Sequence, residues 1–221
     1  LDFEYKKYTL KIKDGFKFLQ NAVVAPFKDF ILHKHWFWIL VLIFTYHLSN
    51  AYFNPMIYPF YAAMGFSKVE VAYVIKLYGM VAAICGGLAG GLIVAKIGLK
   101  RSLWWFGILQ CLSTLLFSAQ ALAGYNMILF IMVVTVENFC SGLATTALVA
   151  YISSLCNKLY TATQYALLSS VMSISRDVFS SSSGVVADNV GWAWFFVISA
   201  LMSVPSLFII KFLIKDEKSS N

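Results

Sequence analysis

Charged residues are scarce in this sequence. Lys, Arg, Asp and Glu make up 12% of the 221 residues, whereas hydrophobic residues make up 60%. Soluble domains typically carry about 25% charged and about 45 to 50% apolar residues, and disordered chains combine low hydrophobicity with high charge. The composition therefore excludes a soluble core and intrinsic disorder, and it indicates an integral membrane protein.

The sequence also lacks the motifs of common enzymes, metal sites and disulfide frameworks. It contains no G-x-S-x-G, no H-E-x-x-H and no phosphate-binding loop. The four cysteines lie in or beside apolar segments and include no C-x-x-C pair. We therefore expect no enzymatic activity, no cofactor and no bound metal.

Six apolar runs are each long enough to cross about 30 Å of hydrocarbon. They cover residues 36–60, 70–95, 103–123, 127–155, 164–187 and 192–214. The breaks between them are short, which favours antiparallel neighbours. The sequence therefore predicts an all-α integral membrane domain of six transmembrane helices over 36–214. A basic, amphipathic cytoplasmic segment is expected over 1–35, and a cytoplasmic tail over 215–221.

Positive charge is distributed unevenly along the chain. Seven of the 17 Lys and Arg residues precede the first run, three lie between runs two and three, one lies between runs four and five, and three end the chain. The loops on the opposite side carry only Lys68. Cytoplasmic loops are enriched in Lys and Arg, so both termini are predicted to be cytoplasmic. The net charge of +7 thus fits orientation in a lipid bilayer, and no basic groove indicates nucleic acid.

Three ionisable residues lie deep in the predicted helices. Glu137 is about 15 Å into the fourth run, and Arg176 and Asp177 are about 18 Å into the fifth, at a rise of about 1.5 Å per residue. A carboxylate at this depth is costly unless it is paired, protonated or hydrated. Two interpretations stay open. One is a structural ion pair between the two helices, and the other is a solvated cavity in which Glu137 titrates and Arg176 attracts an anionic solute.

Polar side chains recur at helical spacing on three of the predicted helices. The stripes are His47, Asn50 and Asn54 on the first, Glu137, Ser141 and Thr145 with Asn138 alongside on the fourth, and Ser169, Ser173, Arg176 or Asp177 and Ser180 on the fifth. Each serine or threonine alone is typical of helix packing. The three stripes together favour a polar cavity.

The second run carries small residues at strict four-residue spacing. These are Gly79, Ala83, Gly87, Gly91 and Ala95, with Gly86 and Gly90 on the adjoining row. Small residues allow helices in a membrane to approach closely. We therefore predict a packing seam here, and we expect Pro55 and Pro59 to break the end of the first helix.

Several stretches of the sequence resemble a known transporter family. The loop with Gly91, Lys96, Gly98, Lys100 and Arg101 resembles a degenerate copy of the cytoplasmic signature of major facilitator transporters, with Ala95 in place of the family's acidic residue. The stretches 136–142 and 155–169 are similar to the fourth and fifth helices of the C-terminal half of AmpG-type muropeptide permeases. Residues 21–26 and 106–110 resemble the same family at the matching places.

The resemblance implies a half of a proton-driven permease of the bacterial inner membrane that imports anhydromuropeptides for cell-wall recycling. It places Glu137 and Asn138 in the central cavity, and Asn157, Lys158 and Gln164 at a cytoplasmic turn. The expected partner is a separately encoded N-terminal half or a second copy of this chain, and we expect from the start at Leu1 either a fragment or an unusual start codon. Two alternatives stay open: a transporter of acetyl-coenzyme A or another organic solute from the same superfamily, and a non-transporting remnant of a split gene.

Overall fold

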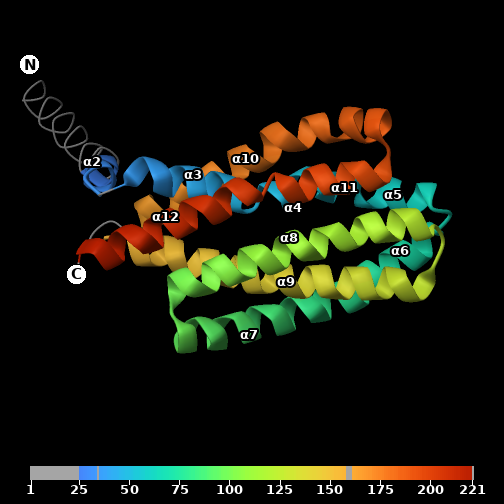
Figure 1. The fold of residues 1–221 in the computed structure, drawn as a ribbon, viewed down its shortest axis with the longest axis horizontal. Helices are drawn as coiled ribbons and strands as arrows, with labels where there is room; N and C mark the ends of the chain where they lie inside the picture. The colour runs from blue at the N-terminus through green and yellow to red at the C-terminus, as the bar shows by residue number, and fades with distance from the viewer. Residues whose placement is uncertain (1–24, 34, 158–160, 221) are drawn as a thin grey trace, which may run out of the picture.

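The chain folds into a bundle of long helices that lie side by side (Figure 1). The computed structural model describes residues 25–33, 35–157 and 161–220, and these ranges contain helices and turns but no strand. In chain order the elements are α2 (Ala25–Ile31), α3 (Trp36–Tyr46), α4 (Leu48–Phe53), η2 (Asn54–Met56), α5 (Ile57–Ala63), α6 (Lys68–Val74), η3 (Ile75–Gly79), α7 (Met80–Ile97), α8 (Leu99–Ala123), α9 (Met127–Leu155), α10 (Thr161–Val190), α11 (Trp192–Leu201) and α12 (Val204–Ser220).

Five helical stretches in the described residues are long and apolar enough to cross a membrane. They are Trp36–Ala63, Lys68–Ile97, Leu99–Ala123, Met127–Leu155 and Trp192–Lys215. The prediction of six such helices is therefore confirmed for five. The remaining one, α10, has 30 residues and is long enough at about 45 Å. Its many serines, with Arg176 and Asp177, make it too polar to qualify by composition.

Glycines with positive φ end the helices at four tight turns. Gly65, Gly98, Gly124 and Gly191 have φ angles of 90°, 86°, 69° and 77°. Only glycine adopts this conformation at little cost, because it has no Cβ. The next helix often begins with a side-chain cap, such as Asn126 Oδ1, which accepts a hydrogen bond from the Leu129 amide at 3.1 Å. The antiparallel arrangement thus follows from signals at the turns.

The first predicted helix is broken at two places. A 3₁₀ turn at Asn54–Met56 contains Pro55, as expected. The second break falls at His47, between α3 and α4, where the backbone leaves the helical region with φ −101° and ψ 11°. No proline or glycine marks this position, so the sequence did not predict it. Near the other end of the chain, α11 and α12 are separated at Met202 and Ser203, just before Pro205.

Helix α9 packs between α7 and α8, and α10 packs against α3 and α4. A Cβ added at Gly86 would clash with the Phe139 carbonyl oxygen, and one at Gly142 would clash with that of Ala83. The predicted packing seam is therefore confirmed where α7 meets α9, on the row of Gly79, Ala83 and Gly87 and on the adjoining row of Gly86 and Gly90. It is wrong at Gly91, where a Cβ would meet nothing within 4 Å.

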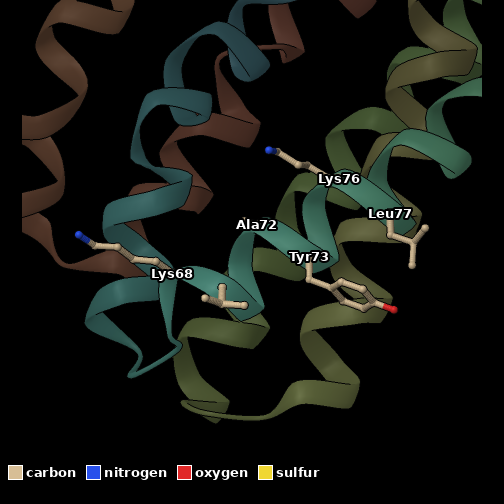
Figure 2. A pocket seen from close by; sticks show the side chains of 6 residues that line it. Lys68, Ala72, Tyr73, Lys76 and Leu77 are labelled. Carbon is tan, nitrogen blue, oxygen red and sulfur yellow. The ribbon is translucent and has the colours of Figure 1, made fainter.

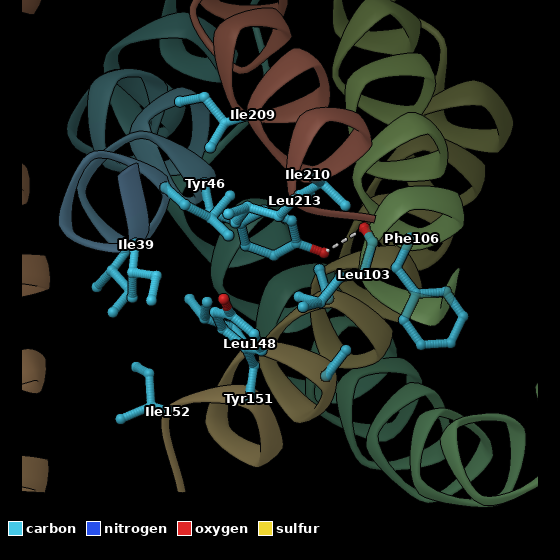
Figure 3. Packing of buried hydrophobic residues seen from close by; sticks show 14 of the residues in the cluster. Ile39, Tyr46, Leu103, Phe106, Leu148, Tyr151, Ile152, Ile209, Ile210 and Leu213 are labelled. Atoms are coloured by element: carbon cyan, nitrogen blue, oxygen red, sulfur yellow. Dashed lines mark hydrogen bonds between the residues drawn. The ribbon is translucent and has the colours of Figure 1, made fainter. Parts of the chain in front are cut away.

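Two apolar clusters fill the bundle, one toward each end. In the first, Tyr46 donates a hydrogen bond to the Leu103 carbonyl at 2.9 Å, among Leu148, Ile210 and other aliphatic side chains (Figure 3). The second is rich in aromatic rings and includes Phe53, Phe60, Phe117, Phe130, Phe195 and Phe196, all at most 1% exposed. The buried polar side chains of Asn50, Gln110 and Glu137 lie between these two clusters along their helices.

The ends of the described chain lie at the same end of the bundle. α2, the turn between α7 and α8, and the last turns of α12 are all found there (Figure 1). Helix α12 continues to Ser220, so it extends past the predicted boundary at 214. Residues 1–24, Lys34 and Lys158 lie outside the described residues, as does the stretch 21–24 of the family resemblance.

Candidate functional site

A cavity of about 430 Å³ lies where α3, α4, α9 and α10 meet. Its apolar lining includes Phe44, Tyr165 and Met172. Its polar lining consists of His47, Asn50, Asn54, Ser141, Thr145, Ser169, Ser173 and Arg176. The structure therefore brings residues from all three predicted polar stripes to one cavity.

Three predicted site residues do not line this cavity. Glu137 is 4% exposed and lies behind the lining, against α8. The Asn138 amide donates to the Val134 carbonyl of its own helix at 2.8 Å, and Asn138 also lies beside Gly79. Asp177 is exposed next to Arg176 on α10. Of the three, Asp177 is joined to the cavity lining by its exposed contact with Arg176, and Glu137 is joined to it by hydrogen bonds between buried side chains.

The connection runs through a buried glutamine. Gln110 Nε2 donates to Glu137 Oε1 and to Asn50 Oδ1, both at 2.8 Å. Asn50 Nδ2 then donates to the Ser141 hydroxyl at 3.0 Å. Asn50 and Ser141 line the cavity. The acid of Glu137 is therefore linked to the cavity lining by this short chain of hydrogen bonds.

The interpretation of Glu137 and Arg176 as a structural ion pair between two helices is wrong for the described residues. Arg176 Nε instead contacts Asp177 Oδ1 at 3.3 Å within α10, and these side chains are 66% and 72% exposed. An exposed pair of this kind contributes little to stability. Arg176 therefore keeps its charge accessible at the cavity.

His47 combines a backbone break with a place in the cavity lining. Its Nε2 lies 3.5 Å from the Thr145 hydroxyl of α9. Non-helical backbone at membrane depth is tolerated where it is buried in protein or lines a water-filled cavity. The break at His47 thus fits a cavity that admits water.

Sequence reasoning missed Gln110 as a site residue. It was noticed only as the last residue of the stretch 106–110 that resembles a family. Ser113 and Thr114 follow it at helical spacing, but this polar row on α8 was not predicted as a stripe. The available signal was that a buried amide in a membrane helix needs hydrogen-bond partners.

The signature loop lies far from the cavity, at the turn between α7 and α8. Gly98 makes the turn, and its carbonyl accepts a hydrogen bond from the Ser102 hydroxyl at 2.8 Å. Lys100 and Arg101 line a separate hollow of about 350 Å³ together with Tyr151 and Ser154 of α9. Lys96 and Gly91 are exposed on α7.

A polar contact at the same end joins α2 to the turn between α9 and α10. Asp29 accepts hydrogen bonds from Gln164 Nε2 at 2.9 Å and from Asn157 Nδ2 at 3.3 Å. The Asn157 amide N–H donates to Gln164 Oε1 at 2.6 Å. Gln164 is fully buried. Helix α2 is therefore fixed to the bundle by specific hydrogen bonds.

A second hollow, of about 590 Å³, lies on the outside of α6 and η3. It is lined by Lys68, Tyr73, Lys76 and Leu77, whose side chains spread over an open surface (Figure 2). η3 is a π-helical turn. In the described residues no group of three or more His, Cys, Asp or Glu side chains could hold a metal ion.

The fold and the cavity define a class of protein: a multi-pass membrane protein with a polar cavity between its helices. Comparison with known proteins specifies the family. Residues 15–221 match the Major Facilitator Superfamily. The chain therefore belongs to the major facilitator superfamily.

The relatives are bacterial proteins named as transporters. The chain is 37% identical over 194 residues to AmpG 4 of Rickettsia felis, which covers 88% of this chain and 47% of that protein. It is 38% identical over 203 residues to AmpG 1 of Rickettsia prowazekii. These residues make up 92% of this chain and 44% of that protein. The chain thus spans about half the length of the curated relatives it matches, and transporters of this kind are not enzymes.

Proposed function

We propose that this chain is a six-helix half of a proton-coupled permease that imports anhydromuropeptides across the bacterial inner membrane, with both termini in the cytoplasm. The observation that carries the proposal is the cavity whose polar lining comes from His47 and from α4, η2, α9 and α10. Its amides, hydroxyls and one guanidinium can bind the hydroxyl, amide and carboxylate groups of such a solute. The similarity to proteins named AmpG supports this class of solute.

The exposed polar face of α10 supports a partner unit. Arg176 and Asp177 are largely exposed in this chain, and charged side chains in a membrane helix need protein or water around them. The relatives are about twice as long as the chain. We infer that a second six-helix unit covers this face and closes the cavity from the other side. An N-terminal half fits the length of the relatives, and a second copy of this chain is the alternative.

Glu137 is the group proposed to carry the coupling proton. Its buried position makes the charged form expensive and the neutral acid less so. Protonation therefore changes the cost of rearranging the helices around the cavity. Alternating access in such transporters moves one half against the other around a site at the midplane.

The experiment is uptake of labelled anhydromuropeptide into proteoliposomes under an imposed pH gradient. The chain is tested alone and together with the N-terminal half of AmpG 4 of Rickettsia felis. We expect uptake only with both pieces. Glu137→Gln should abolish the stimulation by the pH gradient, because a neutral amide cannot take up a proton, while the protein remains inserted.

The matched control is Glu70→Gln, an acid-to-amide change at the outer end of α6. Glu70 contacts Ser67 and Tyr125 and lies away from the cavity, so its variant should transport as the unmodified chain does. Gradient-driven uptake that survives Glu137→Gln would refute the role of Glu137. No uptake by either preparation would favour a non-transporting remnant.

A further inference from the structure

Gln110 on α8 occupies the position between the buried acid and the solute cavity. Its side chain is 2% exposed, and its Nε2 uses both hydrogens, one toward Glu137 Oε1 and one toward Asn50 Oδ1. Asn50 continues the chain of hydrogen bonds to Ser141. A change at Glu137 therefore reaches Asn50 in the cavity lining through one intervening side chain, that of Gln110.

The other end of the same amide is unsatisfied. Gln110 Oε1 is buried and has no hydrogen-bond partner among the residues that the structure describes. Buried acceptors normally have a partner, because leaving one without is unfavourable. Turning the amide over would not help, since its oxygen would then face two other acceptors, Glu137 Oε1 and Asn50 Oδ1. The group that satisfies Oε1 must be a donor beside the amide.

We propose that Gln110 is a positioning residue that holds the protonated form of Glu137 in a two-point acid–amide pair and transmits its protonation to the cavity. The inference rests on the proposed function. A protonated carboxyl group both donates and accepts. With the proton on Oε2, Glu137 donates to Gln110 Oε1 while Oε1 of the acid keeps the hydrogen bond from Nε2 at 2.8 Å. The proton comes from hydronium in the solvent: one of its O–H bonds breaks, one O–H bond forms on Oε2, and water is released.

No charged group of the described residues replaces the proton in this role. The titratable side chains that interact electrostatically with Glu137 are Tyr61 from α5 and Cys140 from α9. Both residue types are ordinarily neutral at pH 7. Across the network, His47 contacts Thr145 and Arg176 contacts Asp177. A proton on Glu137, which already accepts from the same amide, is thus a donor that can satisfy Gln110 Oε1.

Infrared difference spectroscopy of the purified full chain in lipid tests this inference directly. A pH step should reveal a C=O band of a neutral carboxylic acid that is lost in Glu137→Gln. In Gln110→Met, which has similar length but no amide, the same band should move to higher wavenumber because the acid has lost its hydrogen bonds. The matched control is Gln120→Met. This change removes another buried glutamine of α8, which donates a hydrogen bond to the Gly124 carbonyl. In this variant the acid band of Glu137 should not move.

A measurement on the unmodified chain covers the case in which Gln110→Met does not fold. With ¹³C-labelled glutamine side chains, an amide C=O band should shift in the same pH step, because Gln110 Oε1 gains a hydrogen bond. An unshifted acid band in Gln110→Met, an unresponsive amide band, or no acid band from Glu137 would overturn the inference. These readouts need no transport, so a chain that transports nothing refutes the proposed function separately.

Discussion

Arg176 presents its charge to the cavity, with only an exposed partner on the same helix. Its contact to Asp177 at 3.3 Å joins two largely exposed side chains, so it competes weakly with an incoming anion. Under the proposed function we predict that Arg176→Ala weakens binding of a carboxylate-bearing muropeptide about fivefold, which corresponds to about 1 kcal/mol. Binding of the same compound with its carboxylates amidated should change less. Isothermal titration of the assembled transporter measures both.

The control for this prediction is Arg101→Ala, which removes an exposed arginine at the turn between α7 and α8. It should leave both affinities unchanged. Equal losses for the acidic and the amidated compound with Arg176→Ala would show that this arginine has a structural role.

The residue scale also shows how far sequence reasoning reached. The stripes through His47, Asn50 and Ser141 could be predicted because their spacing repeats with the helix. Gln110 was missed although Ser113 and Thr114 follow it at helical spacing, because such hydroxyl groups in a helix often bond to the backbone of their own helix, as these two do. The hydrogen-bond partner of Glu137 could not be predicted either. Counting residues along two helices gives the depth of a side chain in the membrane, but it does not tell which helix faces meet. Glu137 turns toward α8, and Arg176 turns toward the cavity.

Helices α7 and α9 touch through glycines, and this contact is sensitive to one methyl group. A Cβ at Gly86 would overlap the Phe139 carbonyl oxygen, which belongs to backbone and cannot rotate away. We predict that Gly86→Ala destabilises the bundle by about 1 to 3 kcal/mol, the usual cost of overpacking. The midpoint of unfolding in mixed detergent micelles would fall accordingly.

Gly91→Ala on the same helix is the matched change. A Cβ there meets nothing within 4 Å, and alanine has the higher helix propensity, so this variant should be as stable as the original or slightly more so. If both variants lost the same stability, the cause would be general to α7, and the close contact at Gly86 would be refuted.

Helix α2 should depend on Asp29 for its place on the bundle. Its carboxylate accepts hydrogen bonds from Gln164 and Asn157 at the turn between α9 and α10. We predict that Asp29→Ala speeds amide hydrogen exchange in α2 about tenfold or more, because charge-assisted hydrogen bonds contribute about 1.5 to 3 kcal/mol. Lys28→Ala, at an exposed neighbouring position, should leave exchange unchanged. Equal exchange in both variants would mean that other contacts fix α2.

At the scale of elements, the sequence predicted helices well where turns carry glycine. Gly65, Gly98, Gly124 and Gly191 all mark reversals with positive φ. The break at His47 was missed because it depends on packing around the cavity, not on local conformational preference. The seam of small residues on α7 was predicted, but Gly91 near its end meets no neighbour within 4 Å, because only the tertiary structure determines how far along α7 the contact with α9 extends.

At the scale of the whole molecule, the membrane-spanning helices are buried in the bundle to very different extents. In Lys68–Ile97, only 17% of the apolar 18-residue stretch is buried inside the bundle, whereas in Trp36–Ala63 the buried share is 61%. The weakly covered helix is apolar and can face lipid, whereas the exposed charges of α10 cannot do so at low cost. The two faces therefore need different surroundings, which fits one face toward lipid and one toward a second unit.

A measurement of membrane topology can decide whether the chain crosses the membrane five or six times. The question concerns α10, which is too polar to count as a membrane span by composition. We predict that Lys68→Cys reacts with an impermeant maleimide added outside intact cells, while Arg101→Cys and Lys215→Cys react only after the membrane is opened. This follows from the positive-inside rule and from the bundle, in which the last helix returns to the end where α2 lies. The four native cysteines are first replaced by serine or alanine.

Lys215 is the informative position in this set. If α10 crosses the membrane, Lys215 and Arg101 lie on the same side. If α10 does not cross, Trp192–Lys215 runs in the opposite direction and Lys215→Cys is labelled from outside. That result would expose the charges of α10 to water on one side, and it would remove the cavity from the middle of the membrane. Labelling of Lys215→Cys only after permeabilisation would instead require Arg176 and Asp177 to lie within the bilayer, where they need the cover of a second unit.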